Sequence, residues 1–372
     1  MLTNIPFYQH DLDDQVIGAL KETIGSTFLT TGPKTKLFEE TFAQRFNVNH
    51  AIGVSSCTLG LYISLKALGI GSGDEVITSP MTFISSPNAI LYTGATPVFV
   101  DVEPETGNIN TELIEAAITS NTKAIMPVHL YGQLCDMIQL EIIAKKYNIA
   151  IIEDCAHAIE SERDGVLPGQ KSDIAVFSFY ATKNITCGEG GCIITKDEGL
   201  ATLLQKYRLH GMSKNAIDRY QTTYQHWDME LLGHKCNMND LQASILLTQL
   251  PHISERLAKR EQLAMHYEDG LKKCGIKYPK KHKNSRHARH LFTCWAPNNR
   301  DGWLVRLQEK GIGVAVNYQA VHLLTYYKDK FSYEEGDFPE AERIGKTTLT
   351  LPLYPKLTID QINYIVSVFK TR

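Results

Sequence analysis

The chain has 372 residues, of which 43% are hydrophobic and 21% charged, and its formal net charge is −3. This composition is typical of a globular protein, and the length predicts a main domain with a smaller second one. The charge excludes the basic surface of a nucleic-acid-binding protein. Because we find neither a secretory leader nor a bilayer-spanning apolar run, we expect no membrane partner and a cytoplasmic location.

From residue 50 to 195, β-rich segments alternate with helical ones. In chain order they are HAIGVSS, TLGLYISLKAL, DEVITSP, ATPVFVDV, KAIMPVHL, MIQLEIIAKKY and IAIIEDC. This alternation of strands and helices predicts an α/β fold with a mostly parallel central sheet covered by helices. Ligands of such sheets bind at the carboxyl ends of the strands, so the residues that follow each strand are the candidates.

The first candidate is SSCT, residues 55–58, between the strand AIGV and a helix. The amides near Cys57 and Thr58 and the hydroxyls of Ser56 and Thr58 can bind a phosphate there, with an ordinary N-cap as the alternative. The following GIGSG comes after a helix and before a strand, the reverse of the dinucleotide fingerprint, which argues against a dinucleotide oxidoreductase. Phe83 follows the next strand and can stack on a flat cofactor or fill the core.

Asp154 and Lys183 each follow a buried strand, IAII and DIAVFSFY. Burial depresses a lysine pKa and makes the amine available for a Schiff base, whereas an exposed loop lysine is the alternative. A lysine that holds pyridoxal phosphate needs a carboxylate beside the pyridine nitrogen, and Asp154 supplies one, unless it is only an N-cap. His157 is a candidate ring contact or a packing histidine, and Ser178 can add a hydroxyl to the phosphate site.

The segment FSFYATKNITCGEGG surrounds Lys183 with small and hydroxylated residues. These neighbours leave room for a planar cofactor, and we expect Gly188, Gly190 and Gly191 to let the backbone pass close to it. The eight cysteines are scattered without a CxxC pair, which favours reduced thiols. His287 and His290 are too few for a zinc site, so no metal is predicted.

The pattern changes after residue 200. A helical stretch from Met238 to Leu271 is interrupted by Pro251, the strand-like HLFTCWAP and GVAVNY bracket a helix, and IDQINYIVSVFK predicts a final helix. We therefore predict a large domain over residues 1–245, including an N-terminal arm, and a small C-terminal α/β domain over 246–372. The basic segment KYPKKHKNSRHARH is a solvated connector or, alternatively, an anion site.

Together these motifs resemble the DegT/DnrJ/EryC1/StrS family of fold-type I, pyridoxal-phosphate-dependent sugar aminotransferases. The likeness covers nearly the whole chain and is carried by FLTTGPKTKLFEE, GVSSCTLGLYISLKALGIGSGDEVITSPMTF, GATPVFVDV, TKAIMPVHLYGQ, IIEDCAHA, FSFYATKNITCGEGG, RLHGMSK and LGHKCNMNDLQASILLTQL. Within the family, TTGPK, AAITSNTKAIMPVH, KNITCGEGG and residues 235–238 most resemble the UDP-4-keto-pentose aminotransferases of lipid A arabinose synthesis.

The resemblance implies a role for each matching residue. Lys183 would form the Schiff base and move the proton, and Asp154 would pair with the pyridine nitrogen. The other implied cofactor contacts are Ser56, Cys57, Thr58, Phe83, His157 and Ser178, with Lys235 and Asn237 reaching the partner's cofactor in an obligate homodimer. The implied substrate contacts are Asn317, Tyr318 and His322. Cys57, His234 and Cys236 depart from the family pattern. The resemblance therefore does not define the phosphate cup at Cys57 or the sugar contacts at His234 and Cys236.

The implied reaction is transfer of an amino group from L-glutamate to the keto carbon, C-4 first, of a nucleotide-linked sugar. The product would serve amino-sugar, lipopolysaccharide or other surface polysaccharide synthesis, and 2-oxoglutarate would be released. A 3-keto sugar nucleotide or a smaller phosphorylated ketone is the alternative acceptor. A pyridoxal-phosphate-binding regulator without turnover is the non-enzymatic alternative. Lys183 favours transamination over dehydration, because the dehydrating branch has histidine there.

Overall fold

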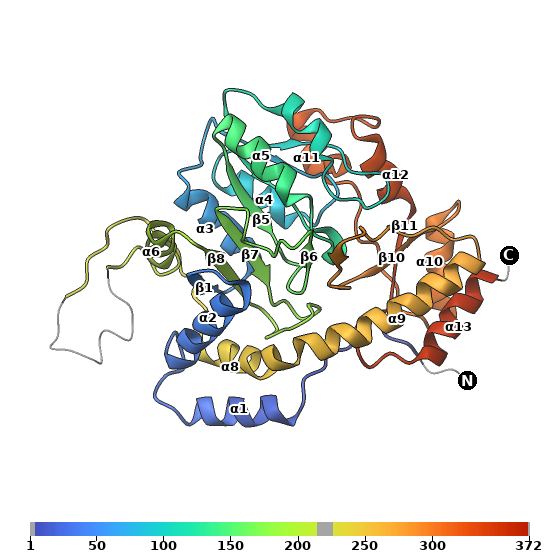
Figure 1. Cartoon of the computed structure of the whole chain (residues 1–372), viewed down its shortest axis with the longest axis horizontal. Coiled ribbons are helices and arrows are strands. Elements are labelled where there is room, and N and C mark those ends of the chain that lie inside the picture. Colours follow the sequence, from blue (N-terminus) through green and yellow to red (C-terminus); the bar gives the residue numbers. More distant parts are fainter. Residues whose placement is uncertain (1–3, 214–225, 371–372) are drawn as a thin grey trace.

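The centre of the molecule is a seven-stranded sheet with the order β1-β8-β7-β5-β4-β2-β3 (Figure 1). The computed structural model describes residues 4–213 and 226–370. The strands are β1 (His50–Val54), β2 (Glu75–Thr78), β3 (Thr96–Phe99), β4 (Thr122–Met126), β5 (Ala150–Asp154), β7 (Ile174–Ser178) and β8 (Gly191–Thr195). All share one direction except β8, which pairs antiparallel with both β1 and β7. The predicted, mostly parallel sheet is therefore confirmed.

Helices cover both faces of this sheet. On one face lie α3 (Cys57–Ala67), α4 (Ser85–Tyr92) and α6 (Glu198–Tyr207), and on the other lie α2 (Pro33–Phe46), α5 (Met137–Tyr147) and α8 (Asp240–Gln249). Successive strand residues enter opposite cores: Ile152 packs with α3, whereas Ile151 packs with α5. Because both faces are buried, the strands read as continuous apolar runs and not as alternating ones.

Side-chain caps set where several helices begin. The Ser56 hydroxyl accepts the Leu59 amide at 3.2 Å and so starts α3 directly after β1. Asn239 and Gln242 form a capping box at the start of α8. The buried Asp240 accepts the amides of Gly32 and Thr35 at 2.8 and 2.9 Å, which joins the start of α2 to α8.

A second core lies in the C-terminal part of the chain. It gathers α9 (Ile253–Lys273), α10 (Arg300–Glu309) and α13 (Ile359–Lys370) around the antiparallel pair β10 (Phe292–Trp295) and β11 (Thr348–Leu351). Figure 1 shows these elements beside the main sheet, with the long α9 leading from α8 to them. Ile5 belongs to the same core and exchanges backbone hydrogen bonds with Gly311 and Gly313.

Most of the predicted C-terminal elements are present. The helix break at Pro251 is a short 3₁₀ turn, η4 (Leu250–His252), between α8 and α9. The prediction of a strand at GVAVNY is wrong, since this segment makes only a single bridge, Ala315 with Thr350. The remaining elements are α1 (Asp14–Ile24), β6 (Glu162–Arg163), β9 (Ser285–Arg286), α11 (Thr325–Phe331), α12 (Pro339–Thr347) and the turns η1 (Thr111–Leu113), η2 (Glu115–Ala117), η3 (Leu130–Gly132) and η5 (Val321–Leu323).

Length and apolarity decide whether a helix can cross a bilayer. Within the described residues, none of the helices combines enough of both to do so.

Candidate active site

A cavity of about 520 Å³ opens at the carboxyl ends of β1, β2, β4, β5 and β7. This is the edge at which parallel sheets bind their ligands. The structure brings most of the sequence-predicted residues to its walls: Ser56, Cys57, Thr58, Phe83, Asp154, His157, Ser178, Lys183, Asn317 and Tyr318. Residues far apart in the chain thus form one site, because they lie at the carboxyl ends of several strands of the same sheet or come from the C-terminal part.

Lys183 enters the cavity from the turn after β7. Its backbone amide donates to the Tyr180 carbonyl at 2.9 Å, which closes this turn. Burial of the amine lowers the pKa of Lys183 to about 8, although Cys57 and Asp154 act in the opposite direction. A lysine amine with this pKa is neutral in an appreciable fraction near pH 7, so it can attack an aldehyde and can also carry a proton.

Asp154 lies at the end of β5 with both carboxylate oxygens engaged. Oδ2 accepts the Ser86 hydroxyl at 2.6 Å, and Oδ1 accepts the Ala156 amide at 3.0 Å. The side chain is 3% exposed, so these contacts fix its direction within the cavity wall. Ser86 did not emerge from the sequence, because nothing in SSPN marks a contact with a carboxylate that lies 68 residues further along the chain.

The loop from β1 to α3 forms a small cup of hydrogen-bond donors. The amides of Cys57 and Thr58 begin the helix and have no intrahelical acceptor. A Cβ atom at Gly191 would lie 2.7 Å from the Cys57 nitrogen, so only glycine lets β8 pass this close to the cup. Gly188 differs, because open space surrounds it and its φ of +83° is what favours glycine there.

The Gly191→Ala variant is expected to lose about 1–3 kcal/mol of unfolding free energy, because the new methyl group overlaps backbone atoms at the start of α3. Urea unfolding measures this difference. Gly18→Ala is the matched control: nothing lies within 4 Å of its Cβ position on α1, so it should be neutral or stabilising by up to about 1 kcal/mol. Unchanged stability in Gly191→Ala would show that the close approach is not required.

Aromatic and imidazole rings also line the cavity. Phe83 is 54% exposed, and its ring centre lies 5.9 Å from that of Tyr318. His157 Nδ1 accepts the Tyr131 amide at 3.2 Å, so its proton is on Nε2, which lies 3.3 Å from the Tyr318 hydroxyl. Burial and the charge of Lys183 lower the pKa of His157 well below its ordinary value. A neutral imidazole therefore faces the cavity as a donor.

Lys235 and Asn237 lie outside this cavity within a single chain. Their segment runs along β1, where the Ser55 amide donates to the Cys236 carbonyl at 2.7 Å. Lys235 is exposed, and the Asn237 amide group donates to the Thr31 hydroxyl at 2.6 Å. The segment is thus held next to the cup of Ser56–Thr58 without reaching into it.

His322 also lies away from the cavity. It is fully buried, its Nε2 lies 3.2 Å from a Glu342 oxygen, and its ring packs on Phe338 at 4.7 Å between centres. Its neighbours therefore give it a packing role, and the substrate contact expected of His322 is not seen.

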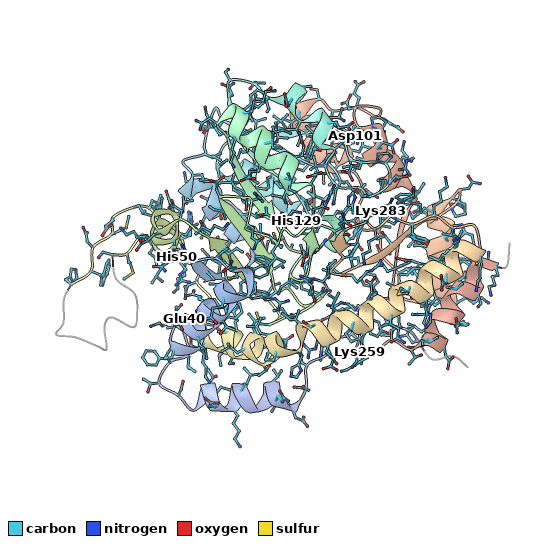
Figure 2. The ribbon with its side chains drawn as sticks, in the orientation of Figure 1. Glu40, His50, Asp101, His129, Lys259 and Lys283 are labelled. Atoms are coloured by element: carbon cyan, nitrogen blue, oxygen red, sulfur yellow. The ribbon has the colours of Figure 1, made fainter. Side chains whose placement is uncertain are left out.

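Three buried potential metal ligands, His129, Glu153 and Cys155, have ligand atoms within 4.8 Å of one another, and His129 also lines the cavity. Figure 2 shows His129 in the interior, whereas the labelled Glu40 and Lys259 lie on outer helices. The cluster is satisfied without an ion: Glu153 accepts from His129 at 2.7 Å and from the Gly169 amide at 2.7 Å. Burial raises the pKa of the Cys155 thiol well above its usual range, which disfavours the thiolate that a metal binds.

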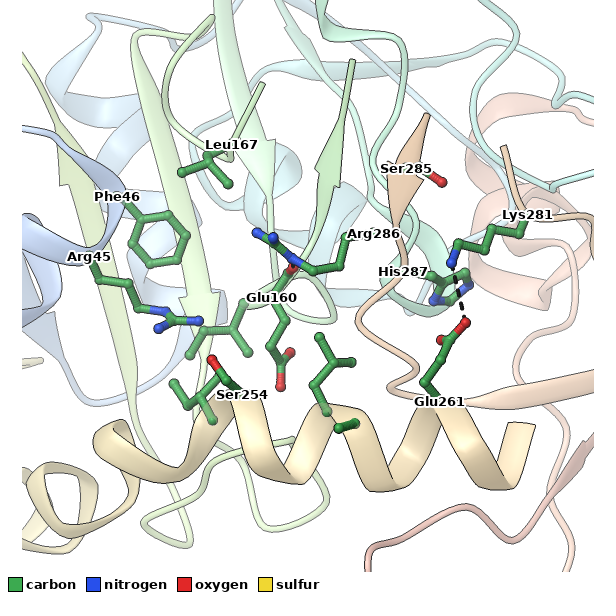
Figure 3. A pocket seen from close by; sticks show the side chains of 14 residues that line it. Arg45, Phe46, Glu160, Leu167, Ser254, Glu261, Lys281, Ser285, Arg286 and His287 are labelled. Carbon is green, nitrogen blue, oxygen red and sulfur yellow. Dashed lines mark hydrogen bonds and ion pairs between the residues drawn. The ribbon is translucent and has the colours of Figure 1, made fainter. Parts of the chain in front are cut away.

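A second cavity of about 640 Å³ lies between α9 and the β6–β9 ribbon (Figure 3). Its walls are largely apolar, with Arg45, Arg286 and Lys281 among the polar residues. Its two carboxylates are engaged with cations, Glu160 with Arg260 and Glu261 with Arg289 and Lys281. Although it is the larger cavity, its lysine, Lys281, is partly exposed and paired with Glu261, so the chemistry is assigned to the cavity of the buried Lys183 amine.

Comparison with known proteins gives one consistent result. The model of the DegT/DnrJ/EryC1/StrS aminotransferase family matches residues 10–370. The Bacillus subtilis spore coat polysaccharide biosynthesis protein SpsC is 40% identical, with 98% of this chain and 96% of SpsC covered. Protein MJ1066 of Methanocaldococcus jannaschii is also 40% identical, over 98% of this chain and 97% of its own.

Solved structures agree with the sequence matches. Spr1654 of Streptococcus pneumoniae, assigned as a sugar aminotransferase and solved in its PMP form, superposes with a TM-score of 0.93 at 32% identity, covering 99% of this chain and 98% of its own. DesV of S. venezuelae, solved with a ketimine intermediate, gives 0.91 at 33% identity, with 99% and 98% covered.

Proposed function

Because this chain belongs to the DegT/DnrJ/EryC1/StrS aminotransferase family, we propose that it moves an amino group from L-glutamate to the keto carbon of a nucleotide-linked sugar. The enzyme is a pyridoxal-phosphate-dependent aminotransferase of fold type I. One observation carries the proposal for its site: the Lys183 amine, with a pKa lowered to about 8, lines the same cavity as Asp154 and the cup of Ser56–Thr58.

The residues present fit the cofactor in charge and in shape. We assign the covalent attachment to Lys183, the ring-nitrogen contact to Asp154 and the stacking contact to Phe83, whose exposed ring already faces the cavity. The phosphate goes to the start of α3, where free amides and hydroxyls favour an anion. The hydroxyls assigned to it are those of Ser56, Thr58 and Ser178.

When bound, the cofactor takes up an amino group at its aldehyde carbon and withdraws electrons from the neighbouring substrate carbon. Lys183 would then be the base and acid: its neutral amine would take the proton from the donor carbon and return it to the carbon that carried the cofactor's aldehyde. Asp154 accepts the ring N–H and so stabilises the positive charge there. His157 and Tyr318 line the same cavity, 3.3 Å apart between Nε2 and the hydroxyl, and would help to position the cofactor ring.

The sugar acceptor is proposed from the family and from the named relatives. SpsC serves spore coat polysaccharide biosynthesis, and PseC of Helicobacter pylori, 26% identical with a TM-score of 0.92, serves pseudoaminic acid biosynthesis. We propose C-4 as the first candidate for the aminated carbon, as in the arabinose-pathway type, although none of the relatives named here is named for that pathway. Asn317 and Tyr318 remain the proposed substrate contacts, whereas the buried His322 has no place in this proposal.

We also propose a homodimer. Lys235 is exposed at the edge of the sheet, and Asn237 lies two residues further along the same segment. In the proposed assembly, this segment completes the cofactor site of a second copy.

Addition of L-glutamate to the purified, cofactor-loaded protein is expected to bleach its visible absorption, because the amino group moves onto the cofactor and releases Lys183. Stopped-flow absorbance measures the rate. A keto sugar nucleotide should then restore the colour, and a panel of 4-keto and 3-keto sugar nucleotides ranks the acceptors. Colour that is stable to glutamate and to other amino acids would instead favour a binding protein without turnover.

A further inference from the structure

A second imidazole lies against the reactive amine. His290 Nε2 is 3.5 Å from Lys183 Nζ, at the outer limit of a hydrogen bond. His290 is 5% exposed and comes from the segment just before β10, 107 residues away in the chain. Contacts of this kind are often long before substrate binds and shorten during the reaction. None of the roles assigned above uses this residue.

The hydrogen bonds of Asn184 determine which nitrogen of His290 carries the proton. The Asn184 amide nitrogen donates to Glu160 at 2.7 Å and to the Ala288 carbonyl at 2.9 Å, so its oxygen must face the ring. That oxygen lies 3.1 Å from His290 Nδ1 and can only accept. The hydrogen therefore sits on Nδ1, and Nε2 presents a lone pair to Lys183.

A buried ion pair holds this arrangement in place. Glu160 and Arg260 are each 2% exposed and are bonded to one another. Figure 3 shows Glu160 above α9 among the residues that line the second cavity. Because Glu160 also binds Asn184, the orientation of the amide is tied to a rigid charged pair and not to solvent.

Burial first, and then the charges of Lys183 and Arg260, keep His290 neutral by lowering its pKa well below the ordinary value. The other titratable groups that interact with Lys183 are Asp154, Cys57 and His157. Near neutral pH, His290 therefore accepts a hydrogen bond from Lys183 and does not take up the proton itself.

We propose that His290 is a further catalytic residue, the hydrogen-bond acceptor that holds the Lys183 ammonium, and that Asn184 positions it. This inference deepens the proposed function and rests on it. When Lys183 takes a proton from the substrate carbon, a C–H bond breaks and an N–H bond forms on Nζ. The new N–H donates to His290 Nε2, which keeps the ammonium directed along the cavity until the proton is returned.

If His290 accepts a hydrogen bond from the Lys183 ammonium, removal of the His290 side chain should lower the pKa of Lys183. In full-length protein without added cofactor, competitive reductive methylation read by peptide mass spectrometry should titrate Lys183 with a midpoint of about 8. His290→Leu should lower this midpoint by about one pH unit, because the ammonium loses a hydrogen bond. Asn184→Ala should lower the midpoint by less, since the ring loses only the contact that fixes its hydrogen on Nδ1. His290→Gln restores an acceptor and should recover most of the shift.

His287→Leu is the matched control. His287 is also buried, at 8% exposed, and lies three residues earlier, but its Nδ1 accepts the Arg289 amide and it does not contact Lys183. The proposal is overturned if His290→Leu titrates like the wild type, or if His287→Leu shifts the midpoint equally. Circular dichroism checks that each variant is folded.

Single-turnover bleaching by L-glutamate gives the second readout. The loaded His290→Leu enzyme should react about 10- to 100-fold more slowly than the wild type. An unchanged rate would also contradict the role. Labelling needs no cofactor or substrate, so a failed colour assay with an intact pKa shift would count against the proposed function and not against this contact.

Discussion

The Lys183→Ala variant is expected to lose at least about 10⁴-fold in turnover, because one side chain supplies both the nucleophile and the proton carrier. The same variant should hold the cofactor only non-covalently and lack the visible absorption of the lysine-bound form. Steady-state assays with glutamate and a keto sugar nucleotide, together with absorption spectra, measure both effects. The side chain lines an open cavity, so its truncation adds to a space that already exists and the fold should survive the change.

Two controls separate chemistry from folding in this experiment. Lys171→Ala removes a lysine that pairs with Glu141 at the surface, and it should leave turnover unchanged. A small external amine such as methylamine should restore part of the activity of Lys183→Ala, since it replaces the missing base. Full activity in Lys183→Ala would remove the basis of the proposed mechanism.

The Asp154→Asn variant should lose about 10²- to 10³-fold in turnover, because the carboxylate no longer stabilises the charged ring nitrogen. Asp154 also raises the pKa of Lys183, so its removal should lower that pKa below about 8. A lower pKa leaves more neutral amine at acid pH. The kcat profile reports the complex in which Lys183 has been released, so its acid limb should move to lower pH, and a profile measured from pH 6 to 10 tests the direction.

Ser86→Ala is the graded comparison for Asp154→Asn. It removes the hydroxyl that donates to Asp154 Oδ2 but keeps the carboxylate, so the expected loss is only about tenfold. If Asp154→Asn retained wild-type turnover, or if Ser86→Ala were the more severe change, the assigned contact between Asp154 and the ring nitrogen would be wrong.

The sheet and most of the cavity were predictable because their signals are local. Strand and helix alternate in the sequence, and the residue after each strand of a parallel sheet has one possible edge to occupy. Lys183 and Asp154 meet for this reason, although the chain between them forms other structure. The family resemblance adds the cofactor, since it explains why a lysine, an acid and a phosphate cup occur together.

The contacts between distant segments could not be predicted in the same way. Ser86 reaches Asp154 across 68 residues and His290 reaches Lys183 across 107, and side-chain hydrogen bonds leave no periodic trace in a sequence. His322 looked like a substrate contact from its neighbours in GVAVNYQAVHLLTYY, yet Phe338 and Glu342 bury it. That burial depends on α12, which the sequence pattern did not connect to this loop.

Borohydride reduction of the cofactor-loaded protein, followed by peptide mapping, tests the central claim most directly. Reduction turns a carbon–nitrogen double bond between lysine and cofactor into a stable single bond, so the modified residue can be located by mass spectrometry. We predict a phosphopyridoxyl group on Lys183 and on no other lysine. Modification of a different lysine, or none after full loading, would contradict the account.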